Sequence, residues 1–398
     1  MRIAYFLQTF PCLTETFVLN ELLELEKDKR FEITIFSLFS DNKIIQPKSK
    51  CLKSPVTYIP DFSSIRQTFI DYPELIIKNL LTKPISTIKL FFLSLKLFKE
   101  KRLRTFYSAL WLSDGLKKRK IEHLHVHFLF YNSDISLLLN MFTKIPISYT
   151  VHAHMTKHPL DTLRLKLGLA KFIITIGNYN KKILLELCPF IKNKIHIINY
   201  GIDLNEFKYN PHFMNAGRNI LAVGRLVWHK GFEDLLMAAK ILGDAKFKFI
   251  MTIIGDGVLK GRLLKLRKKY GLENKVFLAG SVTHDDFNKY YKSADLFVLP
   301  CISDEKNDSD GLPVSLLEAM AYGLPVISTE VANIPEAISS NEGILVPEKN
   351  PAALAEAIMK SLSENKEIIN NRIQNARKKI EKEYNIVNET QKLKKLLN

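Results

Sequence analysis

The stretch DGLPVSLLEAMAYGLPVIS, residues 310–328, contains a predicted helix and a predicted strand that are separated by Gly-Leu-Pro. The helix is expected to start near Pro313, because proline is tolerated in a first helical turn. It is expected to end at Gly323, which can adopt a left-handed conformation, and Pro325 prevents its continuation. A helix followed at once by a short apolar strand is typical of α/β proteins.

The same alternation of apolar strands and helical patterns extends along both halves of the chain. In the first half, strands are predicted at 3–7, 31–38, 123–128, 147–152, 172–177 and 195–199. In the second half, they are predicted at 219–224, 247–255, 276–280, 295–300, 324–329 and 343–347. Strands that alternate with helices form parallel sheets that are covered on both faces. We therefore predict an α/β fold with two Rossmann-like, doubly wound domains that face each other across a cleft.

Changes in composition suggest where the domains end. Residues 200–219 are polar and contain Gly, Pro and several Asn, which is typical of a linker. From residue 365 the chain is rich in Lys and Glu and has a helical periodicity. The sequence therefore predicts a first domain at 1–200, a second domain at 201–365, and helices at 366–398 that pack back across the domains.

The overall composition excludes several classes of protein. The chain has 398 residues, of which 46% are hydrophobic and 25% are charged, as in a folded globular protein. We find no apolar run of the roughly 18 residues that a membrane span needs, and the N-terminus does not resemble a signal peptide. The four cysteines, Cys12, Cys51, Cys188 and Cys301, have no paired spacing. We therefore expect neither a zinc site nor a disulfide framework, and we expect a cytoplasmic location.

The net charge of +17 is concentrated between Lys78 and Lys120, where twelve Lys or Arg stand against only Glu100 and Asp114. Within it, PISTIKLFFLSLKLFKEKRLR (84–104) mixes large apolar residues with cations, which suits an anionic membrane surface. The alternative is a domain helix with its lysines in water and with apolar residues packed inward, namely Leu90, Phe91, Leu95 and Phe98. A nucleic-acid partner is not expected, because no nucleic-acid-binding motif accompanies the charge.

The segment AVGRLVWHKGFEDLLMAAK (222–240) has two cations near the end of a predicted strand. The strand ends at Gly224, Arg225 follows it, and Lys230 comes just before Gly231 and a helix. Ligands of open parallel sheets bind at the carboxyl ends of the strands. Arg can be bidentate to phosphate oxygens, while Lys acts as a point charge. A diphosphate-binding site is therefore favoured over the alternative of a solvated basic loop.

Two carboxylates of the opening stretch are candidates for binding sugar hydroxyls. Asp310 precedes the predicted helix, and Glu318 lies within it among apolar neighbours. The alternatives are that Asp310 only caps the helix and that Glu318 is solvated. The apolar surroundings of Glu318 favour ribose binding by this residue, and Asp310 could bind the hydroxyls of a sugar in the same way. The backbone N–H groups of Gly311, Leu312 and Val314 are candidates for contacting phosphate or sugar oxygens.

These segments resemble the donor half of retaining GT-B glycosyltransferases, in particular family four. The opening FPCLTETFVLNEL (10–22) is similar to the FPxxSETF motif of polysaccharide and lipopolysaccharide enzymes of that family. Further similar segments follow in the family order: HVHF (125–128), ISYTVHAH (147–154), IGNYNKK (176–182) and INYGIDLNEF (198–207). Two residues depart from the family pattern. Asp310 stands where a glutamate is usual, and Met155 stands where an aspartate is frequent.

The resemblance implies a role for each candidate residue. Residues 1–200 would bind the acceptor, and residues 201–365 would bind a nucleotide-sugar donor. Glu318 would hold the nucleotide ribose, Asp310 would contact the transferred sugar, and His152 would lie near the sugar and the acceptor. The donor diphosphate would be held by Arg225, Lys230, Gly311, Leu312 and Val314. The acceptor side would be lined by Thr14, Glu15 and Thr16. The catalytic group would consist of His152, Asp310, Arg225 and Lys230.

Two pairs of histidines raise the question of a metal site. His125 and His127 share one face of a predicted strand, as do His152 and His154. No Cys or carboxylate stands at ligand spacing beside them, and members of the resembled family need no metal. We therefore expect that His125 and His127 pack or form hydrogen bonds, and that the protein uses neither a metal nor a cofactor.

The function implied by the resemblance is that of a retaining glycosyltransferase. It would move a hexose-type sugar from a UDP- or GDP-linked donor to a saccharide or lipid-linked saccharide in capsule, exopolysaccharide or lipopolysaccharide synthesis. It would act peripherally at the inner face of the cell membrane. One alternative is a non-catalytic, membrane-associated protein that binds a nucleotide-sugar, and another is a nucleotide-sugar epimerase or phosphorylase on the same fold. The donor base, the sugar, the acceptor, the linkage and the oligomeric state stay open.

Overall fold

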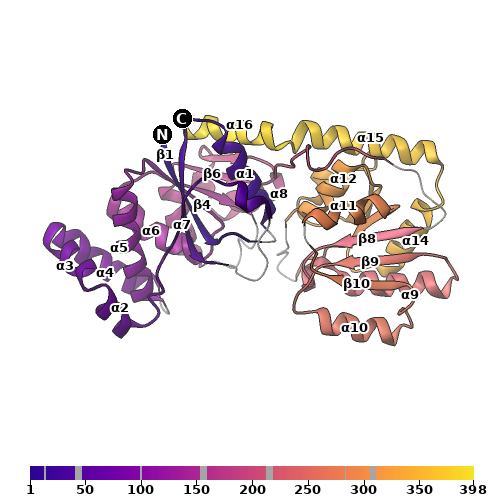
Figure 1. Ribbon diagram of the computed structural model, residues 1–398, viewed down its shortest axis with the longest axis horizontal. Helices are drawn as coiled ribbons and strands as arrows, with labels where there is room; N and C mark the ends of the chain where they lie inside the picture. Colours follow the sequence, from indigo (N-terminus) through magenta and orange to yellow (C-terminus); the bar gives the residue numbers. More distant parts are fainter. Residues whose placement is uncertain are drawn as a thin grey trace. The chain divides into compact units, whose positions relative to one another are not determined.

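The computed structural model describes residues 1–12, 15–40, 47–98, 101–152, 159–211, 218–282, 284–304 and 311–398. The chain forms two compact units (Figure 1). Unit 1 comprises Met1–Thr175, Lys181–Ile198 and Leu393–Asn398. Unit 2 comprises Ile176–Asn180 and Asn199–Lys392.

The sheet of unit 1 has seven parallel strands in the order β3-β2-β1-β4-β5-β6-β7. They are β1 (Arg2–Thr9), β2 (Glu32–Phe39), β3 (Val56–Tyr58), β4 (His123–His127), β5 (Ile147–Val151), β6 (Phe172–Thr175) and β7 (Ile195–Ile197). From β1 the chain continues outward to β2 and β3, and it then returns to β4 on the other side of β1. The strand order therefore reverses between β1 and β4, and ligands of open α/β sheets bind at such a switch point.

Helices cover both faces of this sheet because successive residues of β1 enter different apolar cores. Ile3 and Tyr5 share one core with α1 (Thr16–Glu26), whereas Ala4 and Phe6 share the other with α5 (Arg102–Lys118) and α6 (Tyr131–Thr143). Outside α5 and α6 lie α2 (Ile65–Asp71), α3 (Pro73–Thr82) and α4 (Pro84–Leu97) (Figure 1). The remaining helices of this part of the chain are α7 (Leu160–Leu169) and α8 (Asn178–Leu187).

The sheet of unit 2 has six parallel strands in the order β10-β9-β8-β11-β12-β13. They are β8 (Asn219–Val223), β9 (Ile250–Ile254), β10 (Val276–Gly280), β11 (Leu296–Leu299), β12 (Val326–Thr329) and β13 (Ile344–Val346). The strand order reverses between β8 and β11. The loops that follow these two strands therefore flank the position at which a ligand is expected.

The helices of unit 2 follow its strands. They are α9 (Phe232–Asp244), α10 (Lys260–Lys269), α11 (His284–Ser293), α12 (Val314–Tyr322), α13 (Ile334–Ala337), α14 (Pro351–Ser361) and α15 (Lys366–Glu383). The last helix, α16 (Ile386–Leu397), begins in unit 2 and ends in unit 1. Its residues Leu393 and Leu397 belong to the same apolar core as Ile3 and Tyr5. The two ends of the chain therefore contribute to one core.

The predicted doubly wound α/β fold is confirmed, and each predicted strand is present within a few residues of its expected bounds. The helix expected in the opening stretch is α12, which starts at Val314 and ends before Gly323, whose φ of +100° is left-handed. The short strand β3 was not predicted, because its three residues are half-buried or exposed and form no apolar run.

The packing of α4 agrees with the domain-helix alternative on its inner side, where Phe91 packs against the apolar core. Leu90 is buried as that alternative expected, and Phe98 is buried just after the helix. However, Ile85, Ile88 and Phe92 are exposed, so apolar residues occupy the outer face of the helix as well. None of the helices in the described ranges is long and apolar enough to cross a membrane.

Candidate functional site

A hydrogen bond joins the two segments of unit 2 that carry the predicted donor-binding residues. The Ser315 hydroxyl, in the first turn of α12, donates to the carbonyl oxygen of Val223 at 2.8 Å. Val223 is the last residue of β8, and Gly224 and Arg225 follow it. The N-terminus of α12 therefore lies beside the carboxyl end of β8, at the switch point of the sheet.

Lys230 lies against this strand end. The side chain is only 5% exposed, and a Cβ atom built on Gly224 would lie 3.5 Å from its Cδ atom. Gly231, which follows, has a φ of +67°, and a Cβ atom there would lie 1.7 Å from the carbonyl oxygen of Pro300. Only glycine fits that position, so the backbone after Lys230 packs directly on the end of β11. Arg225 is exposed on the same loop.

The loop after β8 is supported by the loop after β9. The Leu226 N–H donates to the Asp256 carbonyl oxygen at 2.9 Å. Gly255 has a φ of +141°, and a Cβ atom there would lie 1.9 Å from the carbonyl oxygen of Gly224. This close approach requires glycine at position 255 and fixes the backbone next to Arg225.

Three of the predicted phosphate-contacting residues lie at the start of α12. Gly311 has a φ of +74°, Leu312 is buried, and Val314 begins the helix after Pro313 at the N-cap. A helix N-terminus carries N–H groups and a positive dipole end that favour anions. Asp310 lies outside the described residues.

Glu318 is half-buried on α12, in contact with a fully buried tyrosine. The Tyr291 hydroxyl donates to Glu318 Oε2 at 3.1 Å. Burial raises the pKa of Glu318 to about 7, the hydrogen bond from Tyr291 opposes this, and the charge of Glu206 raises the pKa further. Burial also raises the pKa of Tyr291 well above its ordinary value. The pKa of the Glu318 carboxyl group therefore lies near neutral pH. The neighbouring residues in the sequence did not predict this shift.

The predicted acceptor-side residues lie in unit 1, at the start of α1. Glu15 is at the N-cap of this helix and Thr16 is its first residue, and both are half-buried. Thr14 lies outside the described residues, as do His154 and Met155. The loop that carries Glu15 follows β1, so it adjoins the switch point of the first sheet.

His152 follows β5 in the same unit and is buried among aromatic rings. Its ring centroid lies 4.3 Å from that of Phe128 and 4.9 Å from that of Phe17. Phe128 has a φ of +66°, an unfavourable left-handed conformation for a bulky residue, directly after β4. Burial lowers the pKa of His152 well below its ordinary value, and the charge of His127 adds to this.

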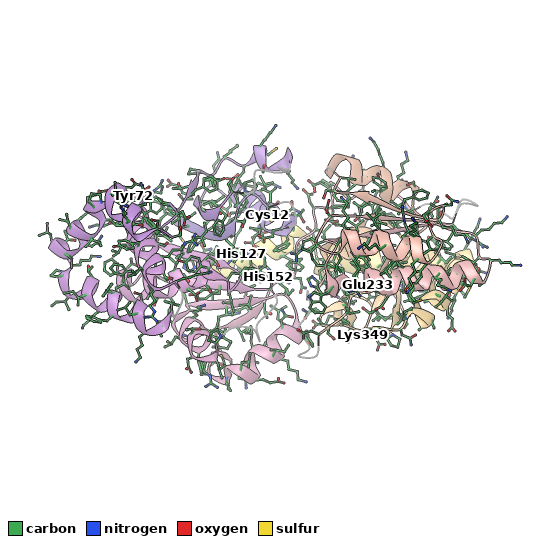
Figure 2. All side chains as sticks on the ribbon, turned by 90° about the horizontal axis from the view of Figure 1, so that it is seen from below. Cys12, Tyr72, His127, His152, Glu233 and Lys349 are labelled. Atoms are coloured by element: carbon green, nitrogen blue, oxygen red, sulfur yellow. The ribbon has the colours of Figure 1, made fainter. Side chains whose placement is uncertain are left out.

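A row of buried histidines lines β4 next to His152. Parallel pairing aligns His125 with Ser148 and His127 with Thr150, so these histidines of β4 lie beside hydroxyl residues of β5. His125 Nδ1 is 2.7 Å from the Ser148 hydroxyl, and its Nε2 is 2.9 Å from the Thr150 hydroxyl. His127 Nδ1 is 3.1 Å from His152 Nε2, and the two rings are stacked with their centroids 5.3 Å apart. Figure 2 labels both residues.

The other side of His127 meets a glutamate that sequence spacing did not connect to it. His127 Nε2 is 3.2 Å from Oε1 of Glu21, a residue of α1, and the Tyr5 hydroxyl donates to the same oxygen at 2.8 Å. The ligand atoms of Glu21, His125 and His127 lie within 4.8 Å of one another, which is compatible with a cation. Both His125 nitrogens are nevertheless at hydrogen-bonding distance from hydroxyl groups, so hydrogen bonds account for this arrangement.

Two family models match most of the chain. "Glycosyl transferases group 1" matches residues 210–379, and "Glycosyltransferase Family 4" matches residues 86–206. The chain is 35% identical to the amylovoran biosynthesis glycosyltransferase AmsK of Erwinia amylovora over 209 residues, 52% of this chain and 51% of that protein. It is 32% identical to the putative colanic acid biosynthesis glycosyltransferase WcaL of Escherichia coli over 200 residues, 50% of this chain and 49% of that protein. The chain thus spans about half the length of these relatives.

Solved structures share the fold over the whole chain. A glycosyltransferase from Rickettsia africae has a TM-score of 0.72 at 17% identity, with 100% of this chain and 99% of that chain covered. Alr3699/HepE of Anabaena, in complex with UDP, has a TM-score of 0.72 at 14% identity with the same coverage. The two parallel sheets and the two matched regions lead to one assignment: the chain belongs to the group 1 (family four) glycosyltransferases and has the GT-B fold.

Proposed function

We propose that this protein is a retaining glycosyltransferase that moves a hexose-type sugar from a UDP- or GDP-linked donor to a saccharide or lipid-linked saccharide. The observation that carries the proposal is the hydrogen bond between Ser315 and Val223, which joins the α12 N-terminus to the loop of Arg225 and Lys230. Two cations and a helix N-terminus at one sheet switch point suit a diphosphate. Family membership supports retention at the anomeric carbon, and the named biosynthetic roles of AmsK and WcaL support a polysaccharide product.

The proposed chemistry rests on stabilising the departing diphosphate. As the bond to the anomeric carbon breaks, negative charge grows on the phosphate oxygens, which Arg225, Lys230 and the N–H groups near Val314 would neutralise. Lys230 is well suited, because its buried stem limits the positions that its ammonium group can take. Glu318 would accept hydrogen bonds from the ribose hydroxyls. Asp310 would do the same for the hydroxyls of the transferred sugar.

The proposed acceptor side consists of Thr14, Glu15, Thr16 and His152. His152 is buried and its pKa is lowered, so it would act as a neutral imidazole that hydrogen-bonds a sugar or acceptor hydroxyl. We propose no metal and no cofactor in this reaction. A diphosphate leaving group is already activated, and Arg225 and Lys230 would supply the charge that it requires.

The test is the release of free UDP or GDP when the purified protein is incubated with UDP- and GDP-sugars and candidate acceptors. We expect Arg225→Ala and Lys230→Ala to lower turnover by about 10²–10³-fold, as removal of one transition-state donor typically does. Lys248→Ala is the matched control, because Lys248 is an exposed lysine of the same unit. Unchanged turnover in both site variants would refute the proposed role. Nucleotide-sugar binding without release of a nucleotide would favour the non-catalytic alternative, and interconversion of the sugar would favour the epimerase.

We also propose that the enzyme binds the inner face of the cell membrane through α3 and α4. On these helices Leu81, Ile85 and Phe92 are 79%, 69% and 63% exposed, and Lys89 and Lys96 lie exposed beside them. An apolar face bordered by lysines suits an anionic bilayer, to which each cation adds about 1 kcal/mol. Membrane binding would bring the active site close to a lipid-linked acceptor.

The membrane proposal is tested by co-sedimentation with vesicles of phosphatidylcholine, with and without phosphatidylglycerol. We expect binding that requires phosphatidylglycerol and that is lost in the double variant Ile85→Ser/Phe92→Ser. The matched control is Phe190→Ser/Ile368→Ser, which also replaces two exposed apolar residues, outside α3 and α4. Equal loss of binding in both double variants would contradict the assignment of this face.

A further inference from the structure

His152 belongs to a buried polar cluster of unit 1 whose other members have no role in the proposed function. Tyr5, Glu21, His127 and His152 come from β1, α1, β4 and the end of β5. Their hydrogen-bonding distances, in that order, are 2.8 Å, 3.2 Å and 3.1 Å. Tyr5, His127 and His152 are each 3% exposed or less, and Glu21 is half-buried. A buried polar group is stable when it has a hydrogen-bond partner. When several such groups are linked, each hydrogen bond restricts which atom of the next group carries the proton.

The direction of each bond follows from the chemistry of the groups. A tyrosine hydroxyl donates to Glu21, and an ionised carboxylate can only accept, so His127 must carry its proton on Nε2. A neutral His127 then has a bare Nδ1, which accepts a hydrogen bond. The partner at that atom is His152 Nε2, at 3.1 Å, which must therefore be the protonated nitrogen of His152.

We propose that Glu21 and His127 are positioning residues that hold His152 in the Nε2-protonated tautomer, and that this placement of the proton is the one that glycosyl transfer requires. This inference rests on the proposed role of His152 in glycosyl transfer. In this arrangement a carboxylate orients an imidazole through hydrogen bonds, and a second imidazole, that of His127, lies between Glu21 and His152. The rings of Phe17 and Phe128 pack against His152 and limit its rotation.

Two further aromatic rings face His127. His125 lies on the same strand with its centroid 4.9 Å away, and Tyr5 stacks on His127 at 5.6 Å. Burial lowers the pKa of both His125 and His152, and the charge of His127 would add to this effect. A proton on His127 would therefore place a cation between two buried imidazoles, with Glu21 as the only carboxylate recorded at its ring among the described residues. It would also reverse the bond to His152.

The test reads the tautomer directly, by long-range ¹H–¹⁵N NMR of protein labelled with ¹⁵N-histidine. The His152 signals are assigned by their loss in His152→Asn. We expect His152 Nε2 to be protonated and Nδ1 to be bare at neutral pH in the wild-type protein. A proton on Nδ1 would overturn the proposal without any variant or activity measurement, and a Zn²⁺-induced shift of the His125 and His127 signals would replace it with a metal site.

Two variants of Glu21 separate positioning from packing. Glu21→Gln keeps an oxygen acceptor for His127 and Tyr5, so the tautomer should persist and turnover should change only a few-fold. Glu21→Leu removes the acceptor, so both His152 tautomers should appear and kcat should fall by about 10- to 100-fold. UDP affinity should stay unchanged in both variants, because the proposed nucleotide site lies in unit 2.

The outcomes distinguish this inference from the proposed function. An active wild-type enzyme whose His152 tautomer is the same in Glu21→Leu would overturn the positioning role and leave glycosyl transfer intact. Equal loss of turnover in Glu21→Gln and Glu21→Leu would also overturn it, since charge rather than proton placement would then matter. A wild-type protein that neither binds UDP nor releases it from any donor would instead refute the proposed function.

Discussion

The replacement Glu318→Gln should make the protein more stable at pH 8 and leave its stability unchanged at pH 4.5. Burial raises the pKa of this carboxyl to about 7 from the 4.5 of an unburied glutamate, so the folded state binds its proton more tightly than the unfolded state does. The contribution of Glu318 to the free energy of unfolding of the wild-type protein therefore falls as the pH rises from about 4.5 to about 7. Above about pH 7 this contribution is constant. A shift of about 2.5 units corresponds to at most about 3 kcal/mol. Glutamine stays neutral and its oxygen can still accept the bond from Tyr291.

Urea unfolding at pH 4.5 and pH 8 measures this difference. The chain has two tryptophans, so a Trp111→Phe background leaves Trp228 as the reporter of unit 2. The exposed Glu356 of α14 provides the control Glu356→Gln, which should give no comparable difference between the two pH values. If Glu318→Gln destabilises the protein equally at both values, the carboxyl is not held in a poorly solvated site and the reasoning is refuted. If Glu318 also binds ribose, the stabilised variant should bind UDP about 10-fold more weakly, because a hydrogen bond to a charged group is lost.

Three further changes follow from individual positions. Gly231→Ala should abolish UDP binding measured by calorimetry, since its new Cβ atom would collide with the Pro300 carbonyl oxygen, whereas retained affinity would show that this backbone can shift. Lys166→Met should lower the free energy of unfolding by about 2 kcal/mol in urea, because it leaves Asp134 without the ammonium group that now lies 2.5 Å away. Asp310→Glu restores the usual family residue, and we expect higher turnover or a different sugar preference in a competition between donors; identical kinetics would mean that Asp310 does not contact the sugar.

The sequence predicted the fold well because both sheets are built from short apolar strands that are separated by recognisable turn and helix-end residues. Pro313, Gly323 and Pro325 determine where α12 begins, where it ends and where the next strand starts, and these are local effects. The burial of Lys230 beside Gly224 was not predictable in the same way, because it depends on the contact between Gly231 and the end of β11. The sequence therefore predicted features that depend on neighbouring residues, and it did not predict close packing between distant segments.

The polar cluster of unit 1 shows why part of the site could not be foreseen. Histidine spacing on β4 indicated a shared face, and the serine, threonine and histidine of the neighbouring strand have the same spacing. Pairing these two strands would have suggested the bond between His127 and His152. Glu21 comes from a helix more than a hundred residues earlier, and Tyr291 reaches Glu318 from another helix, so spacing along the chain carried no signal for either contact.

The shared core of the two chain ends has a consequence for folding during synthesis. Leu393 and Leu397 lie in the apolar core that contains Ile3 and Tyr5, so unit 1 lacks part of its interior until residues 393–397 have been synthesised. Domains often fold as they emerge, N-terminal domain first. In this protein unit 1 completes its core only after α16 has been synthesised, and a chain that stops before Leu393 would leave apolar residues of that core uncovered.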